Sequence, residues 1–486
     1  MLQKNGEKSI WDSPFLRSKT EKDRVTLPEM LFGYFLGPFL VLAMTSVVSS
    51  YYLTFYRSYD DIVSQGMFLT LLPLLSVIPM AISNMFVGIL VGKTKTRAGK
   101  ARPYLLASAP ILMMAGILVF CIPELGLGMR MVWMAVTFNL FAAIANPIYS
   151  TSHYLMVSLS TRDLNQRGRL SVIANIPAVA GNGLVSSILL PMILSWINAA
   201  ESHSMAQNRW KLIMTCFSLA ACIGCILEYM FTRERITEED VDAGVDMENV
   251  DEIPTKVQLK AVAHDKFWWI VMIFYLFYQM GVMFKGGYIF NIFCHDFLNS
   301  VTIFGMNLTG DLVQSVLALI SGIPLALGML FIWPLANHFG KKNMIVIGCA
   351  ISIVGSIVCL SNPSDFVTVL IGQTLKGISS IPGAYVMMAL FADVLDHLEA
   401  VNGFRVDGVS MSVYNLIMTV VNGLAVAIFN FFYDQSGLGT KAVSSFFFLG
   451  FEIIAHGILI ILMSFLTVEK NIVEEQKCIA ERKQKK

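Results

Sequence analysis

The sequence predicts an all-α polytopic membrane protein with twelve transmembrane helices in two six-helix bundles. Hydrophobic residues make up 55% of the 486 positions and charged residues 14%, with a mean hydropathy of +0.64. Such a composition holds too much apolar surface for one soluble core. The apolar residues also fall into runs of about 20, the length at which a helix crosses the hydrocarbon layer. Helices are favoured because lipid offers the backbone no hydrogen-bond partners.

The predicted spans are separated by short polar loops, apart from one long acidic loop in the middle of the chain. They cover residues 29–55, 66–92, 103–122, 131–157, 170–198, 210–232, 267–292, 309–337, 343–361, 365–391, 409–433 and 443–467. The bundles are predicted over 29–232 and 267–467, joined by the acidic loop 233–266. Residues 1–28 are too long and too charged for a cleaved signal peptide, and 468–486 form a basic tail.

Lysine and arginine are distributed unequally between the two sides of the predicted membrane. Loops on the side of the N-terminus hold 28 of the 35, the opposite loops hold five, and Lys285 and Lys376 lie inside spans. Cytoplasmic loops of membrane proteins carry an excess of these residues. The sequence therefore predicts a multi-pass protein of the cell membrane with both termini in the cytoplasm.

The loop between spans two and three is unusually basic for its length. Residues 92–103, GKTKTRAGKARP, contain five lysines and arginines, glycines suited to tight turns and a proline suited to the first turn of a helix. Membrane topology alone accounts for the positive sign. The spacing also suits donors that cap the C-termini of neighbouring helices. The loop is thus either a topology signal only or a segment that is bound and released.

Two loop types occur once in each half of the chain. Residues 337–348, NHFGKKNMIVIG, repeat the glycine followed by basic residues between spans eight and nine. Asp163 precedes Arg167 in the loop after span four, and Asp393 precedes Arg405 at a similar place after span ten. Internal repeats of this kind are typical of secondary transporters. The pattern predicts two related halves of six spans each.

These loops resemble those of the glycoside-pentoside-hexuronide:cation symporter family, the melibiose-permease-like branch of the major facilitator superfamily. The resemblance rests on KTRAGKARPYLL at 95–106 and FADVLDHLEAVNGFRVDGVSMSVYNLI at 391–417, supported by NPIYS at 146–150 and DLNQRGRL at 163–170. It extends over nearly the whole chain in span order. It implies the major facilitator fold, in which two bundles alternate access to a central site.

The resemblance also implies a cytoplasmic gate, because loops of the two halves pair in the outward-open state. The candidate residues are Arg97, Lys100, Arg102, Asp163, Arg167, Asp393, Arg405 and Asp407. One exposed ion pair contributes only about 0 to 1 kcal/mol. Several such pairs can bias two states whose free energies differ by a few kcal/mol.

The cation site of the family is altered in this sequence. Members carry two aspartates four residues apart on span two and a lysine on span eleven, which fall here at Met80, Asn84 and Asn422. A charge that has lost its partner is costly in a membrane, so the joint loss of all three charges is expected where the ion site itself is gone. We therefore expect facilitated transport, or H⁺ coupling through a relocated group.

Polar side chains inside the spans predict the solute site, because ionisable groups at membrane depth usually line a pathway. The candidates for solute binding are Asn146, Tyr149, His153, Asn175, Lys376 and Asn422. Lys376 lies too deep to reach the interface and favours an anionic or carbonyl-bearing solute, unless it pairs with a carboxylate. The groups left for H⁺ coupling are His153, Glu452 and His456, although span twelve is normally a scaffold helix in the superfamily.

The sequence thus predicts a secondary transporter of a small organic solute. Two alternatives remain: a sugar or glycoside:cation symporter with a shifted ion site, and a non-transporting sensor or scaffold.

Cys222 and Cys225 have CxxC spacing, but no second pair follows, so neither a metal nor a redox role is expected. Nothing resembles a nucleotide loop, a catalytic triad or a nucleic-acid surface, so we expect no enzyme, no cofactor and a monomer in the bilayer.

Overall fold

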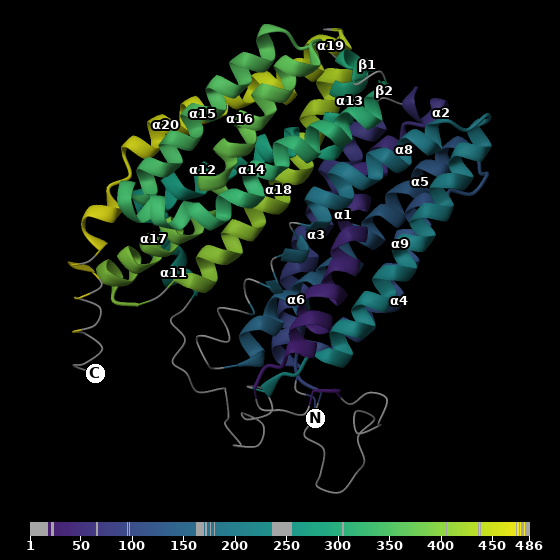
Figure 1. Ribbon diagram of the computed structural model, residues 1–486. Coiled ribbons are helices and arrows are strands. Elements are labelled where there is room, and N and C mark those ends of the chain that lie inside the picture. The colour runs from purple at the N-terminus through teal and green to yellow at the C-terminus, as the bar shows by residue number, and fades with distance from the viewer. Residues whose placement is uncertain are drawn as a thin grey trace, which may run out of the picture. The chain divides into compact units, whose positions relative to one another are not determined.

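The computed structural model is helical apart from one hairpin in the residues that it describes. These are 18–20, 24–64, 67–94, 96, 98–161, 170, 173–174, 176–178, 180–235, 255–303, 306–404, 406–435, 437, 439–472, 474–475, 477 and 481. The hairpin joins β1 (Ser300–Ile303) to β2 (Met306–Thr309) in antiparallel register. The chain divides into two compact units, residues 1–249 and 250–486, which are coloured purple to teal and green to yellow in Figure 1.

Unit 1 contains the first six predicted spans, three of which include π-helical turns. Its helices are η2 (Glu29–Leu36), α1 (Gly37–Tyr56), α2 (Asp60–Val63), α3 (Met67–Lys93), α4 (Arg102–Phe120), α5 (Leu127–Asn139), η3 (Leu140–Ala145), α6 (Asn146–Ser160), η4 (Gly181–Leu189), α8 (Leu190–Asn198) and α9 (His203–Phe231). The π-helical segments η2, η3 and η4 continue directly into α1, α6 and α8.

Unit 2 contains the other six spans, with shorter helices at their ends. Its helices are α11 (Thr255–His264), α12 (Lys266–Phe284), α13 (Gly287–Phe297), α14 (Gly310–Phe339), α15 (Lys341–Ser361), α16 (Phe366–Tyr385), α17 (Met387–Asn402), α18 (Asp407–Gln435), α19 (Thr440–Ser445), π-helical η5 (Phe446–Gly450), α20 (Phe451–Ser464) and the 3₁₀ turn η6 (Val468–Lys470).

Each predicted span coincides with helix in the described residues, which confirms the all-α polytopic membrane fold. Ten of these helices are long and apolar enough to cross a membrane by length and composition. The other two are α14, of which Gly310–Leu325 counts as a shorter apolar helix, and α16, which carries Lys376.

The ends of two predicted spans differ from the structure. Span ten was expected to run to residue 391, but α16 ends at Tyr385 and α17 begins at Met387. Pro382 lies in the last turn of α16 and has no N–H for the helix ladder. Span seven was expected to be continuous, but it breaks at Lys285 and Gly286, between α12 and α13.

Helix starts follow from local sequence. The Ser202 hydroxyl accepts a hydrogen bond from the Met205 N–H at the start of α9. Asp265 and Asp365 cap α12 and α16 in the same way. Helices α4 and α6 instead carry proline in their first two positions, where the missing N–H costs nothing.

Glycines allow close helix packing in both units. A Cβ atom at Gly37 would lie 2.9 Å from the carbonyl oxygen of Gly224, so α1 and α9 approach backbone to backbone. A Cβ atom at Gly372 would lie 2.6 Å from the carbonyl oxygen of Gly355, so α15 and α16 pack in the same way. Small residues at helix contacts are the usual basis of packing in membranes.

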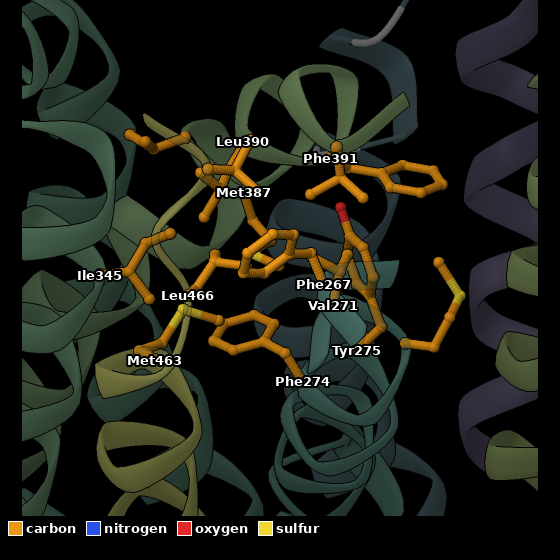
Figure 2. Packing of buried hydrophobic residues seen from close by; sticks show 14 of the residues in the cluster. Phe267, Val271, Phe274, Tyr275, Ile345, Met387, Leu390, Phe391, Met463 and Leu466 are labelled. Atoms are coloured by element: carbon orange, nitrogen blue, oxygen red, sulfur yellow. The ribbon is translucent and has the colours of Figure 1, made fainter. Parts of the chain in front are cut away.

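A buried apolar cluster holds α12 against α15, α17 and α20 in unit 2. Figure 2 labels members of this cluster that pack against one another: Phe267, Val271, Phe274, Tyr275, Ile345, Met387, Leu390, Phe391, Met463 and Leu466. Because α12 and α20 are fixed against each other here, the charged residues farther along both helices are held at defined positions.

Candidate functional site

Three charged side chains meet inside unit 2. Lys376 Nζ lies 2.8 Å from Glu452 Oε2, and Lys285 Nζ lies 2.6 Å from Glu452 Oε1. The side chains of Lys376 and Glu452 are each 1% exposed, whereas that of Lys285 is 21% exposed. They come from α16, α20 and the C-terminal end of α12, so three separate spans contribute to one ionic cluster.

Neutral groups surround this cluster. Ser356 of α15 donates a hydrogen bond to Glu452 Oε2 at 3.3 Å. Lys376 Nζ donates to the backbone carbonyl of Phe448 at 3.0 Å and lies 5.1 Å from the centroid of that ring. Phe448 belongs to the π-helical segment η5, and such segments are frequent at functional sites. Lys376 therefore pairs with a carboxylate of the protein, which is the alternative to pairing with an anionic solute that the sequence left open for this residue.

A second buried polar cluster joins spans four and six in unit 1. The Tyr149 hydroxyl donates to Glu228 Oε2 at 2.8 Å, and His153 Nδ1 lies 2.7 Å from Glu228 Oε1. The rings of Tyr149 and His153 are stacked, with centroids 5.5 Å apart. Glu228 is 0% exposed and His153 1%. Two predicted solute-binding residues thus lie together, packed between α6 and α9 around a buried carboxylate.

The basic loop of unit 1 is bound by a carboxylate of the same unit. The backbone N–H groups of Lys100, Ala101 and Arg102 each donate to the Glu234 carboxylate at 2.8 Å. A negative charge at the first turn of α4 also complements the helix dipole. The Arg102 side chain is buried, and its guanidinium donates to the backbone carbonyl of Tyr229 at 2.9 Å. In this structure Arg102 is therefore bonded within unit 1.

The corresponding loop of unit 2 has the same arrangement. The N–H groups of Lys341 and Lys342 donate to the Glu469 carboxylate at 2.7 and 3.2 Å. Lys341 Nζ lies 2.6 Å from a carboxylate oxygen of Asp393, which is buried, and this burial raises the pKa of Asp393 above its usual range. Glu234 and Glu469 each follow the last span of their unit, which extends the repeat seen in the loops.

The positions at which the sequence predicted an altered cation site carry neutral side chains, and the two asparagines among them are hydrogen-bonded to other protein groups. Asn84 is exposed, and its amide donates to the backbone carbonyl of Met80 at 3.0 Å, one turn earlier in α3. Asn422 Oδ1 accepts a hydrogen bond from Gln279 Nε2 at 3.2 Å, and Asn146 is half-buried at the start of α6. Within the described residues, no three His, Cys, Asp or Glu side chains are grouped to hold a metal ion.

Some predicted site residues lie outside the described residues. They are Asn175 of the solute set, Arg97, Asp163, Arg167 and Arg405 of the gate, and the side chain of Asp407.

The match to a known family covers most of the chain. Residues 33–468 match the family described as MFS/sugar transport protein. The chain belongs to this family. The resemblance to the glycoside-pentoside-hexuronide symporters is thereby confirmed, and the protein is a multi-pass membrane protein and a secondary transporter.

Similar proteins are named as transporters and symporters rather than enzymes. The chain is 27% identical over 394 residues to an isoprimeverose transporter of Lactiplantibacillus pentosus, covering 78% of this chain and 74% of that protein. It is 22% identical over 366 residues to a glucuronide carrier protein homolog of Escherichia coli, covering 74% and 73%. The crystal structure of a D-xylose-proton symporter shares the fold, with a TM-score of 0.62, 14% identity and coverage of 90% and 97%.

Two of the carboxylates that organise these clusters, Glu234 and Glu469, were not predicted as site residues from the sequence. Glu452 was predicted only as a candidate for H⁺ coupling on a scaffold helix, without its lysine partners. A signal for Glu234 and Glu469 was present, because each is the first carboxylate after the last span of its half. No local signal links Glu452 to Lys376, which are 76 positions apart in the chain.

Proposed function

We propose that the protein moves a small sugar-like solute across the cell membrane by alternating access of two six-helix bundles, without Na⁺ at the family-type site. The bundles are residues 29–232 and 267–467, both termini lie in the cytoplasm, and the monomer is the transporting unit. The observation that supports the ion assignment is the pair Met80 and Asn84. Na⁺ needs several oxygen ligands, and affinity for a hard cation rises with the number of carboxylates among them.

The test is solute counterflow and net uptake in sealed proteoliposomes, with Na⁺, Li⁺ or H⁺ gradients imposed one at a time. We expect counterflow without any ion gradient and no accumulation driven by Na⁺. Accumulation above equilibrium driven by Na⁺ alone would refute the proposal. Solute binding without counterflow would instead support the non-transporting sensor.

Coupling to H⁺ through a relocated group is a second candidate, supported by the contact of His153 with Glu228. His153 Nδ1 lies 2.7 Å from Glu228 Oε1, and both side chains are buried between α6 and α9. If H⁺ binds there, Glu228→Gln should abolish accumulation driven by a pH gradient while counterflow persists. Unchanged H⁺-driven accumulation in this variant would place the coupling elsewhere, with Glu452 and His456 as the next residues to test.

The cytoplasmic loops are proposed as the gate, with Lys100, Arg102 and Asp393 as its members in the described residues. The loop at residues 92–103 is hydrogen-bonded to Glu234, and the loop that contains Lys341 and Lys342 is hydrogen-bonded to Glu469. These bonds within each unit give each loop a fixed shape for contact with a partner loop. Replacing Arg97 and Arg102 by glutamine should slow turnover and leave equilibrium solute affinity within a few-fold. Normal transport rates with unchanged insertion would refute the gating role.

A further inference from the structure

The cluster of Lys285, Lys376 and Glu452 carries one more positive than negative charge. Among the described residues, Glu452 is the only carboxylate within ion-pair distance of either lysine. Lys376 is enclosed, with Glu452 and the Phe448 carbonyl as partners. A charge that is not neutralised inside a membrane protein is costly and usually functional. Lys285 is the partly exposed member, so a further anion can reach the cluster only there.

The backbone at Lys285 adds to this positive field. Helix α12 ends at Phe284 and α13 begins at Gly287, so span seven is interrupted beside the lysine. Gly286 has extended backbone angles, φ −61° and ψ 159°, and is the N-cap of the 11-residue helix α13. The N-terminus of a helix carries a partial positive charge and N–H groups that bind anions. Interrupted spans near the membrane midplane commonly form the solute sites of secondary transporters.

Lys285 lies on the side of α16 that faces away from the exposed apolar surface of that helix. Val367, Ile371 and Ile378 form this exposed surface. Ser380 follows Ile371 by nine positions, which at about 100° per residue places it on the opposite face. Lys285 Nζ lies 3.5 Å from the Ser380 hydroxyl. The partial exposure of Lys285 is therefore not toward the apolar face of α16.

We infer that Lys285 binds a negatively charged group of the solute, so that the preferred solutes are sugar acids or other sugars with one carboxylate. This inference rests on the proposed transport function and specifies the charge of its solute. Glu452 acts as a positioning residue, because it fixes Lys285 Nζ, and the Ser380 hydroxyl is a neighbouring polar group. A bound carboxylate balances the cluster, with two positive and two negative charges. Chloride has the same charge, and the experiment separates it from a solute carboxylate.

The experiment compares matched pairs of labelled solutes with the full-length protein in proteoliposomes: D-glucuronate with D-glucose, and D-galacturonate with D-galactose. Labelled chloride is tested in parallel. The thermal unfolding midpoint of the purified protein is measured with each compound at constant ionic strength. The variants are Lys285→Met and Lys285→Arg, and the control is Lys266→Met, which removes an exposed lysine at the other end of α12.

We expect at least one sugar acid to enter faster than its neutral parent by about tenfold or more, and to raise the unfolding midpoint more. Lys285→Met should remove this preference, Lys285→Arg should retain most of it, and Lys266→Met should match the unmodified protein.

Neutral sugars that enter as fast as their acids in the unmodified protein would overturn the inference and leave the proposed transport function intact. This comparison does not depend on the folding of any variant. Stabilisation by chloride that depends on Lys285, without an effect of sugar acids, would also overturn it. If none of the compounds enters or stabilises the protein, the solute is not a simple sugar acid and the inference fails. Counterflow with neutral glycosides then decides the transport function separately.

Discussion

Replacing Glu452 should destabilise the protein more than replacing Lys376, although the two form one ion pair. Glu452→Gln leaves Lys285 and Lys376 near each other without a carboxylate. Removing one partner of a buried ion pair costs about 3 to 5 kcal/mol, because the other charge remains buried and unpaired. Here two charges remain, and they repel each other. We expect a loss in the free energy of unfolding at or above the upper end of that range.

Lys376→Met should have a smaller effect, because Lys285 still neutralises Glu452. The variant loses the hydrogen bond from Lys376 Nζ to the Phe448 carbonyl and one of the two ion pairs of Glu452. A hydrogen bond that involves a charged group contributes about 1.5 to 3 kcal/mol, and methionine keeps most of the buried side-chain volume. We therefore expect a loss of about 1.5 to 3 kcal/mol.

The assay is chemical or thermal unfolding of the two single variants and the double variant in one detergent, with size-exclusion profiles as a check on folding. The double variant should be less destabilised than the sum of the two single variants, because it keeps one lysine and no carboxylate. Equal destabilisation by Lys376→Met and Glu452→Gln would refute the assignment of Lys285 as a second partner of the carboxylate.

Three further predictions test local features of the structure. Glu234→Ala should lower the free energy of unfolding by about 1 to 3 kcal/mol, measured by chemical denaturation, because three backbone N–H groups lose their acceptor. Gly372→Ala should destabilise by a similar amount, since its Cβ would lie 2.6 Å from a backbone carbonyl of α15, whereas Gly457→Ala, with open space around it, should be neutral. Hydrogen bonding to Asp311 raises the pKa of His295, so this contact stabilises the folded state below the ordinary pKa of about 6.5 and loses its effect as the pH rises through the raised value. The unfolding midpoint should therefore fall over that window, and Asp311→Asn should remove the fall.

The spans could be predicted from sequence because the determining interaction is local. A run of about 20 apolar residues is stable in lipid only as a helix, whatever the rest of the chain does. The predicted bounds of spans seven and ten are wrong because the helix is interrupted inside an apolar run. Helix α16 ends at Tyr385, before the apolar run ends, and the break at Lys285 and Gly286 interrupts an otherwise continuous apolar segment.

The partners of the charged residues could not be predicted in the same way, because they are set by tertiary packing. The sequence indicated that the basic loop would bind carboxylates, and the nearest acidic segment in the repeat was the loop after span ten. The carboxylate that binds it in unit 1 is Glu234, 132 positions from Arg102. Lysine and glutamate patterns identify which residues carry charge, but the helix contacts decide which charges meet.

The contrast between the two halves has a functional consequence for transport. In unit 1, the described side chains that bond to the buried Glu228 carboxylate are Tyr149 and His153. In unit 2 the buried carboxylate Glu452 contacts two lysines. The carboxylate of unit 1 is thus bonded to a phenol and an imidazole, whereas the carboxylate of unit 2 is shared by two lysines. If both proposals hold, the two halves have different roles, with H⁺ bound in unit 1 and the solute anion bound in unit 2.

Measuring charge movement during uptake of a sugar acid tests this assignment of roles, because symport of one H⁺ with one monoanion carries no net charge. A current that scales with uptake would show that the two sites are not coupled one to one.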